Sequence, residues 1–440
     1  MKTIIYILFF AAAMLPASLY AQQKRHVLLI SIDGLRPDFY LDQAWKAPNL
    51  RKLAASGVWS AGISSVFPSV TYPAHTSLVT GAFPGRHGVY YNAPVNAEKG
   101  RWYWESSYIR TPTLWDAARS AGIRTGAVMW PVTVGAPIDY NFPVKRADND
   151  DESDQLSVTQ PYLQPATLIR DFEAAHGKLS RADFDNTGPL DATMGKLAAH
   201  IIGKYKPGLM AVHFVTVDHQ QHAHGRDAVA SKEALARVDS MVGTLMATLE
   251  GAGMAKNTAV IVTGDHGMVD SEYSLAPNTW LAQAGLLDKN DWKARFQPAG
   301  GAAFLYLKSP ADLQRVHQVL AALPPAVQAS FRVLDRAALD RAGVNPEVSL
   351  ALAMKKGVIA VGGQNQPGLV KLKAGKAGHG HFPDFKEIQT GFIASGSGIG
   401  RSELRKALSI TDIAPLVAQL LGIPFNAPDG KLVPGILKQH

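Results

Sequence analysis

Cysteine is absent from this sequence of 440 residues. Its absence excludes disulfides, a lipid anchor attached through cysteine, and thiolate ligands for a metal ion. Basic residues outnumber acidic ones by only 44 to 36, and they are scattered rather than gathered in a stripe. We therefore expect no nucleic-acid polymer as a partner. Apolar runs long enough to approach a membrane span are missing outside the amino terminus.

The amino terminus has the pattern of an export signal. A lysine at position 2 precedes an apolar run over residues 4–15, and small residues follow up to Ala21. The run is shorter than the roughly 20 residues that a spanning helix needs, so a cleaved signal is favoured over a membrane anchor. We predict a signal peptide over residues 1–21, a periplasmic or secreted bacterial enzyme, and no stable membrane anchor. The sequence predicts no oligomeric state.

The order of apolar segments predicts the fold class. The full sequence is 47% hydrophobic, and the mature chain expected over 22–440 is long enough to bury one large core and a smaller lobe. Strand-length apolar runs alternate with amphipathic stretches, which indicates an α/β fold: a mainly parallel sheet flanked by helices on both faces. An inserted lobe is expected at about 285–375, and the acidic run over 148–154 is expected to be a solvated loop. The expected strands are 27–32, 125–129, 209–217, 259–263 and 391–394, and the expected helices are 47–56, 113–121, 192–205 and 231–251.

Three aspartates follow strand-like apolar runs. Asp33, Asp218 and Asp265 each take this position, where open α/β sheets gather ligands beyond the carboxyl ends of their strands. A single aspartate there can be a turn or cap residue, but three of them, two with a nearby histidine, are poorly explained that way. His222 is four residues after Asp218, which puts both side chains on one face if the chain turns into a helix there, and His266 directly follows Asp265.

Carboxylates and imidazoles without thiolates suit Zn²⁺ best, with Mn²⁺ or Mg²⁺ as alternatives. The sequence therefore predicts a metal-dependent hydrolase with two metal ions, and Thr71 offers a hydroxyl between turn-forming prolines. A threonine hydroxyl is a poor nucleophile until a metal lowers its pKa. On local grounds alone, Ser69, Thr76 and Ser77 are rival nucleophiles.

Several long segments carry a resemblance. Taken together, they are similar to the nucleotide pyrophosphatase/phosphodiesterase family of the alkaline phosphatase superfamily, from about residue 26 to the carboxyl terminus. The segments are 31–36, 67–92, 130–131, 218–225, 264–268, 379–380 and 411–430.

The resemblance implies an alkaline-phosphatase-like fold and a site with two zinc ions. It implies that one zinc is held by Asp33, Asp265, His266 and the Thr71 oxygen. The second zinc is then held by Asp218, His222 and His379. Thr71 is implied as the nucleophile and Asn92 as the donor of an amide hydrogen bond to a phosphoryl oxygen, where negative charge is concentrated.

The chain also departs from the family pattern. His381 directly follows Gly380, at the position where the family more often has an aromatic residue. His381 is therefore a rival to His379 as a ligand. Ala74 stands where the family commonly has asparagine. The remaining histidines near the motifs are interpreted as supporting or surface groups; they are His75, His87, His219 and His224.

The residues that related enzyme families require narrow the possible reaction class. A sulfatase needs a cysteine or serine that becomes formylglycine, and the candidate position here is Thr71. A phosphomonoesterase of the threonine type typically has a Lys-x-Arg pair, which the stretch 129–135 lacks. We therefore expect a phosphodiesterase or nucleotide pyrophosphatase acting on a small phosphodiester or nucleotide. A phosphomonoesterase or a phosphonate hydrolase is the alternative, and a non-catalytic exported binding protein is a remote one. The aromatic residues expected to bind the substrate are Phe67, Tyr72, Tyr91 and Trp130.

Overall fold

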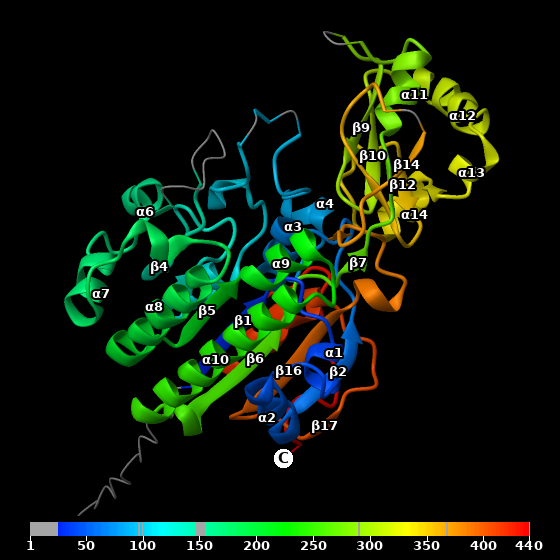
Figure 1. Ribbon diagram of the computed structural model, residues 1–440. Coiled ribbons are helices and arrows are strands. Elements are labelled where there is room, and N and C mark those ends of the chain that lie inside the picture. The colour runs from blue at the N-terminus through cyan, green and yellow to red at the C-terminus, as the bar shows by residue number, and fades with distance from the viewer. Residues whose placement is uncertain are drawn as a thin grey trace, which may run out of the picture.

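The centre of the molecule is a twisted eight-stranded sheet (Figure 1). The structure is a computed structural model that describes residues 25–95, 97–98, 100–146, 155–288, 291–366 and 368–439. Five neighbouring strands, β6, β1, β5, β3 and β4, run parallel, and β16 joins β6 and β2 in antiparallel pairs. In spatial order the strands are β17 (Ser402–Glu403), β2 (Val58–Ile63), β16 (Thr390–Gly396), β6 (Thr258–Thr263), β1 (His26–Ile32), β5 (Leu209–Phe214), β3 (Thr125–Val128) and β4 (Tyr140–Phe142).

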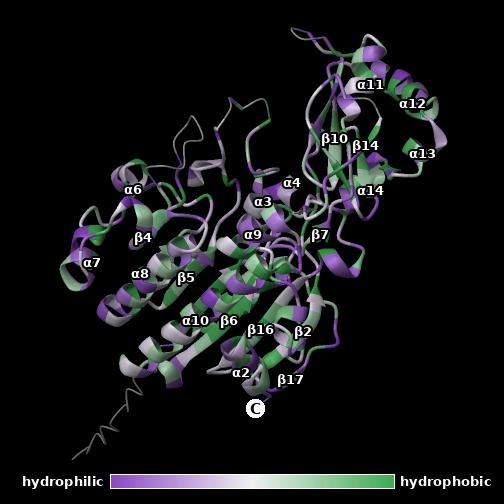
Figure 2. Cartoon of the chain, in the orientation of Figure 1, coloured by the Kyte–Doolittle hydropathy of each residue, from purple (hydrophilic) through white to green (hydrophobic). Residues whose placement is uncertain are grey.

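Helices cover both faces of this sheet, because the central strands are apolar on both sides. In β1, Leu28 and Ile30 belong to one hydrophobic cluster and Val27 and Leu29 to another. The first cluster includes α2 (Pro48–Ser56), α8 (Pro189–Tyr205) and α10 (Val229–Gly251), and the second includes α3 (Thr71–Thr80), α5 (Leu114–Ser120) and α15 (Ile413–Leu421). Figure 2 shows apolar residues along the strands and polar residues on the outer sides of the helices. The predicted α/β class with a mainly parallel sheet is confirmed.

The predicted elements agree with the structure to within a few residues except at one place that matters for function. The run 209–217, predicted as one strand, ends as a strand at Phe214, and α9 (Thr216–His224) begins two residues later. The carboxylate of Asp191 on α8 accepts hydrogen bonds from the backbone N–H groups of Val215 and Thr216, at 3.0 and 2.9 Å, and so starts the helix there. Asp218 consequently lies in the first turn of a helix.

A second group of small sheets stands beyond the main sheet (Figure 1). We call the part of the chain from β8 to β14 the lobe. It contains a four-stranded antiparallel sheet and a three-stranded sheet whose strand β8 precedes residue 285. The strands of the lobe are β9 (Ala294–Pro298), β10 (Ala302–Leu307), β11 (Phe331–Leu334), β12 (Leu350–Met354), β8 (Tyr273–Leu275), β13 (Val358–Ala360) and β14 (Leu369–Lys371).

Two predicted segments fall outside the described residues: the signal peptide over 1–21 and the acidic run over 148–154. Within the described part of the chain, no helix is both long and apolar enough to cross a membrane.

Candidate active site with paired metal-ligand groups

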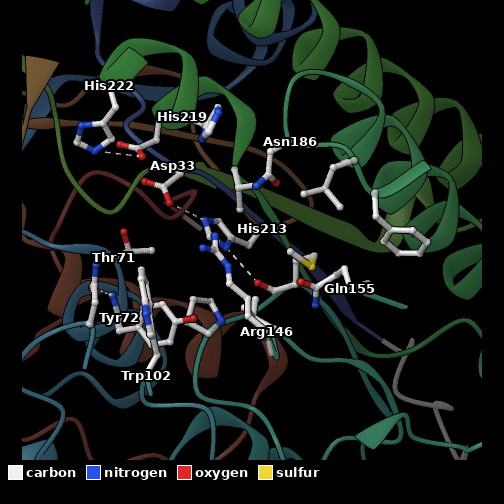
Figure 3. Close-up of a pocket in the computed structure, with 18 of the residues that line it drawn as sticks. Asp33, Thr71, Tyr72, Trp102, Arg146, Gln155, Asn186, His213, His219 and His222 are labelled. Carbon is white, nitrogen blue, oxygen red and sulfur yellow. Dashed lines mark hydrogen bonds and ion pairs between the residues drawn. The ribbon is translucent and has the colours of Figure 1, made fainter. Parts of the chain in front are cut away.

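A cavity of about 220 Å³ opens where β1, β5 and the start of α3 meet. Figure 3 shows Asp33, Thr71 and His222 along one side of this cavity and Arg146 and Asn186 on the other. Residues from segments far apart in sequence thus share one space. Of the residues predicted for the site, those that line this cavity are Asp33, Thr71, Tyr72, Asn92, Asp218, His222 and His379.

The first ligand group lies at the ends of β1 and β6. The Nε2 atom of His266 is 3.3 Å from Asp33 Oδ1 and 3.1 Å from Asp265 Oδ2. The other oxygen of Asp265 accepts the backbone N–H groups of Gly34 and His266, at 3.1 and 3.0 Å. Asp33 Oδ1, Asp265 Oδ2 and His266 Nε2 are buried and have no hydrogen-bond partner. Three buried polar atoms that converge in this way are expected to bind a cation, since unpaired polar groups are costly to bury.

The second ligand group joins α9 to the segment after the lobe. His222 Nε2 lies 3.4 Å from Asp218 Oδ2, and His379 Nε2 lies 3.7 Å from Asp218 Oδ1. Ligand atoms of Asp218, His222 and His379 all lie within 4.8 Å of one another, and so do those of Asp33, Asp218 and His266. Asp218 therefore stands between the two groups.

The three site histidines share one orientation. The Nδ1 atoms of His222, His266 and His379 lie 2.8 to 2.9 Å from the backbone carbonyl oxygens of Ala377, Gly267 and Ser69 respectively. In a neutral imidazole, donation from Nδ1–H to a carbonyl leaves Nε2 as a free acceptor aimed into the site, which is the usual arrangement of metal-binding imidazoles. Burial, followed by the proximity of His266 and His222, holds the pKa of His379 well below its ordinary value, so this ring is neutral near pH 7.

The electrostatic surroundings of Asp33 also favour a bound cation. Its pKa is raised well above the ordinary value, first by burial and then by repulsion from the carboxylates of Asp265 and Asp218. A buried carboxyl group whose charged form is disfavoured in this way is stabilised as a carboxylate by positive charge beside it, which a bound cation would supply. The donor set of three carboxylates and three imidazoles thus fits divalent metal ions.

Thr71 is the first residue of α3, so its hydroxyl stands at the positive end of a ten-residue helix. Asn92 lies beside it, and its side-chain oxygen accepts the backbone N–H of Tyr72 at 3.0 Å. The amide nitrogen of Asn92 is therefore left to donate into the cavity. A hydroxyl and an amide donor next to two ligand groups can hold a phosphoryl group between them.

The aromatic residues expected at the substrate divide into two pairs. Tyr72 lines the cavity, and Tyr91 lines a neighbouring one. Trp130 and Phe67 line neither of these two cavities within the described residues, because both are core side chains. Trp130 packs between His75 and Trp115, with ring centroids 5.0 and 6.3 Å away, and Phe67 packs against Phe304 and Phe382, both at 5.0 Å.

The rival ligand His381 lies apart from both groups. Its Nε2 is 3.0 Å from the carbonyl oxygen of Val358, and burial lowers its pKa to about 4. Among the described residues, the groups of potential ligands include His379 and not His381.

Several lining residues were not predicted from the sequence: Trp102, Arg146, Gln155, Phe184, Asn186 and His213. His213 is buried in β5, with its Nε2 3.2 Å from Asp33 Oδ2 and its Nδ1 3.0 Å from the carbonyl oxygen of Met129. A signal for His213 existed, since it is the one polar residue in the apolar strand 209–214. The others come from segments without a recognisable motif.

Comparison with known proteins places the chain in a family. The sequence profile described as type I phosphodiesterase / nucleotide pyrophosphatase matches residues 27–347. Mouse ectonucleotide pyrophosphatase/phosphodiesterase family member 7 is 23% identical over 443 residues, covering 97% of this chain and 90% of the mouse protein. Human family member 1 is 24% identical over 250 residues, covering 55% of this chain and 23% of that protein.

Among solved structures, human ectonucleotide pyrophosphatase / phosphodiesterase 5 matches with a TM-score of 0.66 at 19% identity, covering 92% of this chain and 97% of that one. This likeness shows a shared fold. Because the family profile spans most of the chain, the chain belongs to the type I phosphodiesterase / nucleotide pyrophosphatase family, whose members are metal-dependent hydrolases of phosphodiester and pyrophosphate bonds.

Proposed function

We propose that the chain is an exported, zinc-dependent phosphodiesterase and nucleotide pyrophosphatase that works through a phospho-threonine formed on Thr71. The observation that carries the proposal is that one cavity is lined by Thr71, Asn92, Asp33 and the whole second ligand group of Asp218, His222 and His379. His266 and Asp265 adjoin this cavity through Asp33, whose Oδ1 lies 3.3 Å from His266 Nε2. Nucleotide derivatives are the preferred substrates because the family relatives carry that activity in their names.

The proposal assigns the ligands as two sets. Asp33, Asp265 and His266 would hold one zinc ion beside Thr71, and Asp218, His222 and His379 would hold the other. Bound zinc supplies positive charge for the phosphoryl oxygens and lowers the pKa of a hydroxyl or water.

Each protein group then has a defined task. Thr71 Oγ forms a bond to phosphorus as the bond from phosphorus to the leaving oxygen breaks, and the threonine proton is released while the leaving oxygen gains one. The Asn92 amide donates to a non-bridging oxygen, where negative charge is concentrated. Water then attacks the phospho-threonine, which releases a phosphate monoester and restores the Thr71 hydroxyl.

The first experiment measures bound metal in the purified chain and compares hydrolysis of bis(p-nitrophenyl) phosphate with that of p-nitrophenyl phosphate. We expect about two zinc ions per chain and faster cleavage of the diester. Faster cleavage of the monoester would instead identify a phosphomonoesterase.

Substitution of the nucleophile tests the mechanism. Thr71→Ala removes the attacking oxygen, so kcat for the diester should fall by roughly 10³-fold or more, as for other nucleophiles. Thr71→Ser should keep measurable turnover. The matched control is Thr76→Ala on the same helix, because the Thr76 hydroxyl donates to the carbonyl of Tyr72 at 2.8 Å and does not line the cavity. A Thr71→Ala protein with full activity would reject the mechanism.

A further inference from the structure

Gln221 is a fully buried residue of α9 that stands between the two ligands supplied by this helix. It comes three residues after Asp218 and directly before His222, so the three side chains share one face of the helix. Gln221 lines neither the first cavity nor the neighbouring one that Tyr91 lines. Its role is therefore sought in the groups to which its amide is hydrogen-bonded.

Both ends of the Gln221 amide are paired with groups that follow β1. Its nitrogen donates to the carbonyl of Gly34 at 3.1 Å, and its oxygen accepts from Nη1 of Arg36, also at 3.1 Å. Among the described residues, no other hydrogen bond joins α9 to residues 33–36. Glutamine suits this place because one partner is an acceptor and the other is a donor.

Gly34 connects this contact to the first ligand group. It directly follows Asp33, and its N–H donates to Asp265 Oδ1 at 3.1 Å. The helix packs so closely that a Cβ atom on Gly34, whose φ is +67°, would lie 2.9 Å from Gln221 Nε2 and 3.5 Å from Asp218 Oδ1. Gly34 thus touches a ligand of the first group through its N–H and the helix of the second group through its carbonyl.

Arg36 fixes the other end of the amide. Its buried guanidinium donates from Nε to Asp38 at 3.1 Å and from Nη2 to Asp227 at 2.7 Å. The nitrogen that donates to Gln221 also donates to the carbonyl of Arg226 at 2.9 Å, just beyond the end of α9. A planar guanidinium with this many partners has one position, so its bond to Gln221 holds the amide in one orientation.

The two ligand groups are supported differently by the fold. Asp33 and Asp265 follow β1 and β6, which are paired with each other in the sheet. Asp218 and His222 lie instead on a nine-residue helix outside the sheet. The position of the second group relative to the first therefore depends on what joins this helix to the end of β1.

Two other contacts of α9 do not reach the first ligand group. Asp191 accepts the backbone N–H groups at the start of the helix, and His222 Nδ1 lies 2.8 Å from the carbonyl oxygen of Ala377. Both contacts remain when the side chain at position 221 changes. Loss of the Gln221 amide is thus expected to shift the second group rather than to unfold the helix.

We propose that Gln221 is a positioning residue that fixes the second ligand group against the first and so determines how tightly the second metal ion binds. This inference rests on the proposed function, because it concerns an ion that the second group would hold. Gln221 itself supplies no ligand atom and meets no substrate; it acts through Asp218 and His222.

Substitution of the amide tests the inference. Gln221→Met keeps a side chain of similar length and removes both hydrogen bonds. We expect the affinity for one of two zinc ions to fall roughly 10- to 100-fold, measured by competition with a chelator. The zinc concentration that gives half-maximal diester cleavage should rise by the same factor, which a general loss of folded protein would not produce.

A double variant identifies the ion that is affected. His379→Asn removes a ligand of the second group, so the ion that it retains belongs to the first. Adding Gln221→Met to this variant should change the affinity for the retained ion by less than about threefold. A tenfold or greater loss in the double variant would mean that Gln221 supports both groups alike, and this would overturn the inference.

Gln220→Met is the matched control. Gln220 is also buried on α9 and lines neither cavity, and within the described part of the chain its side chain makes no hydrogen bond. This variant should bind both ions as the wild type does. Thermal melting checks folding, and Gln221→Asn, whose amide is one methylene too short to span both partners, should weaken the same ion and replaces Gln221→Met if that variant does not fold.

The outcomes separate the inference from the proposed function. A folded position-221 variant that binds both zinc ions with wild-type affinity would overturn the inference, and so would equal weakening in Gln220→Met. A wild-type chain that binds no metal would instead reject the proposed function.

Discussion

At the scale of single residues, the choice between two neighbouring histidines can be tested by counting metal ions. His379 presents Nε2 to Asp218, whereas the Nε2 of His381 faces the carbonyl oxygen of Val358. We expect His379→Asn to reduce bound zinc from two ions per chain towards one and His381→Asn to retain both, as measured by elemental analysis after dialysis. Loss of metal from the His381 variant alone would reverse the assignment.

His213 is predicted to act through Asp33. Its Nε2 lies 3.2 Å from the carboxylate oxygen that does not face His266, so it fixes the direction of the ligand. His213→Phe keeps a buried ring and removes this hydrogen bond, which should weaken metal binding by roughly 10- to 100-fold. Competition with a chelator measures the change. His87→Phe is the control, since buried His87 contacts Ser77 and Val89 rather than a ligand, and equal affinities in the two variants would contradict this role.

At the scale of elements, the sequence predicts strands buried on both faces more accurately than the switch between a strand and a helix. The runs 27–32 and 259–263 end close to where β1 and β6 end, because continuous apolar stretches are required on both faces. The strand predicted over 209–217 is too long at its carboxyl end because Val215, Thr216 and Val217 also favour strands. The hydrogen bonds that Asp191 accepts override that preference, and no local pattern reveals them.

The hydrogen bonds that Asp191 accepts also lead to a prediction for α9. Asp191 is buried and accepts the backbone N–H groups of Val215 and Thr216 as well as the Thr216 hydroxyl. Asp191→Ala should lower the free energy of unfolding by about 2 kcal/mol and also lower kcat/KM, because α9 carries Asp218 and His222. Chemical denaturation and diester kinetics give the two values.

The matched control removes a helix cap that does not line the cavity. Asp116 caps α5 through the backbone N–H of Thr113, at 2.8 Å. Asp116→Ala should cost about 1 kcal/mol of stability and leave kcat/KM unchanged. If both variants lost activity equally, the link between the Asp191 cap and the site would be wrong.

At the scale of the whole molecule, the sequence located the candidate ligands but not the surfaces that surround them. Aspartates at strand ends and the long motifs are local signals, and they suffice to predict Asp33, Asp218 and Asp265. Trp102, Arg146 and Phe184 reach the first cavity only through tertiary packing. Gln297 and Ile359 line the neighbouring cavity that Tyr91 also lines, and they do so through the position of the lobe, which no spacing in the sequence specifies.

We predict that neutralising one of the clustered carboxylates stabilises the metal-free protein and destabilises the metal-bound protein. Carboxylate oxygens of Asp33 and Asp218 lie within 4.8 Å of each other. The Nε2 atom of His266 contacts both Asp33 and Asp265, so these two carboxylates are also close together. Without metal, these carboxylates repel one another inside the protein, whereas bound metal turns the same charges into ligands. Asp218→Asn should therefore raise Tm by about 1 to 3 °C in chelator and lower it in zinc, as followed by calorimetry.

A buried carboxylate without this role provides the comparison. Asp239 accepts the backbone N–H groups of Asn49 and Leu50 at the start of α2, away from the cavity. Asp239→Asn should lower Tm by the same amount with and without zinc, because its partners are neutral amides in both states. A decrease in Tm for Asp218→Asn in chelator would mean that the clustered carboxylates do not repel one another in the metal-free protein. The effect of Asp218→Asn on Tm would then have the same sign in chelator and in zinc, and the clustered side chains would not be arranged to hold cations.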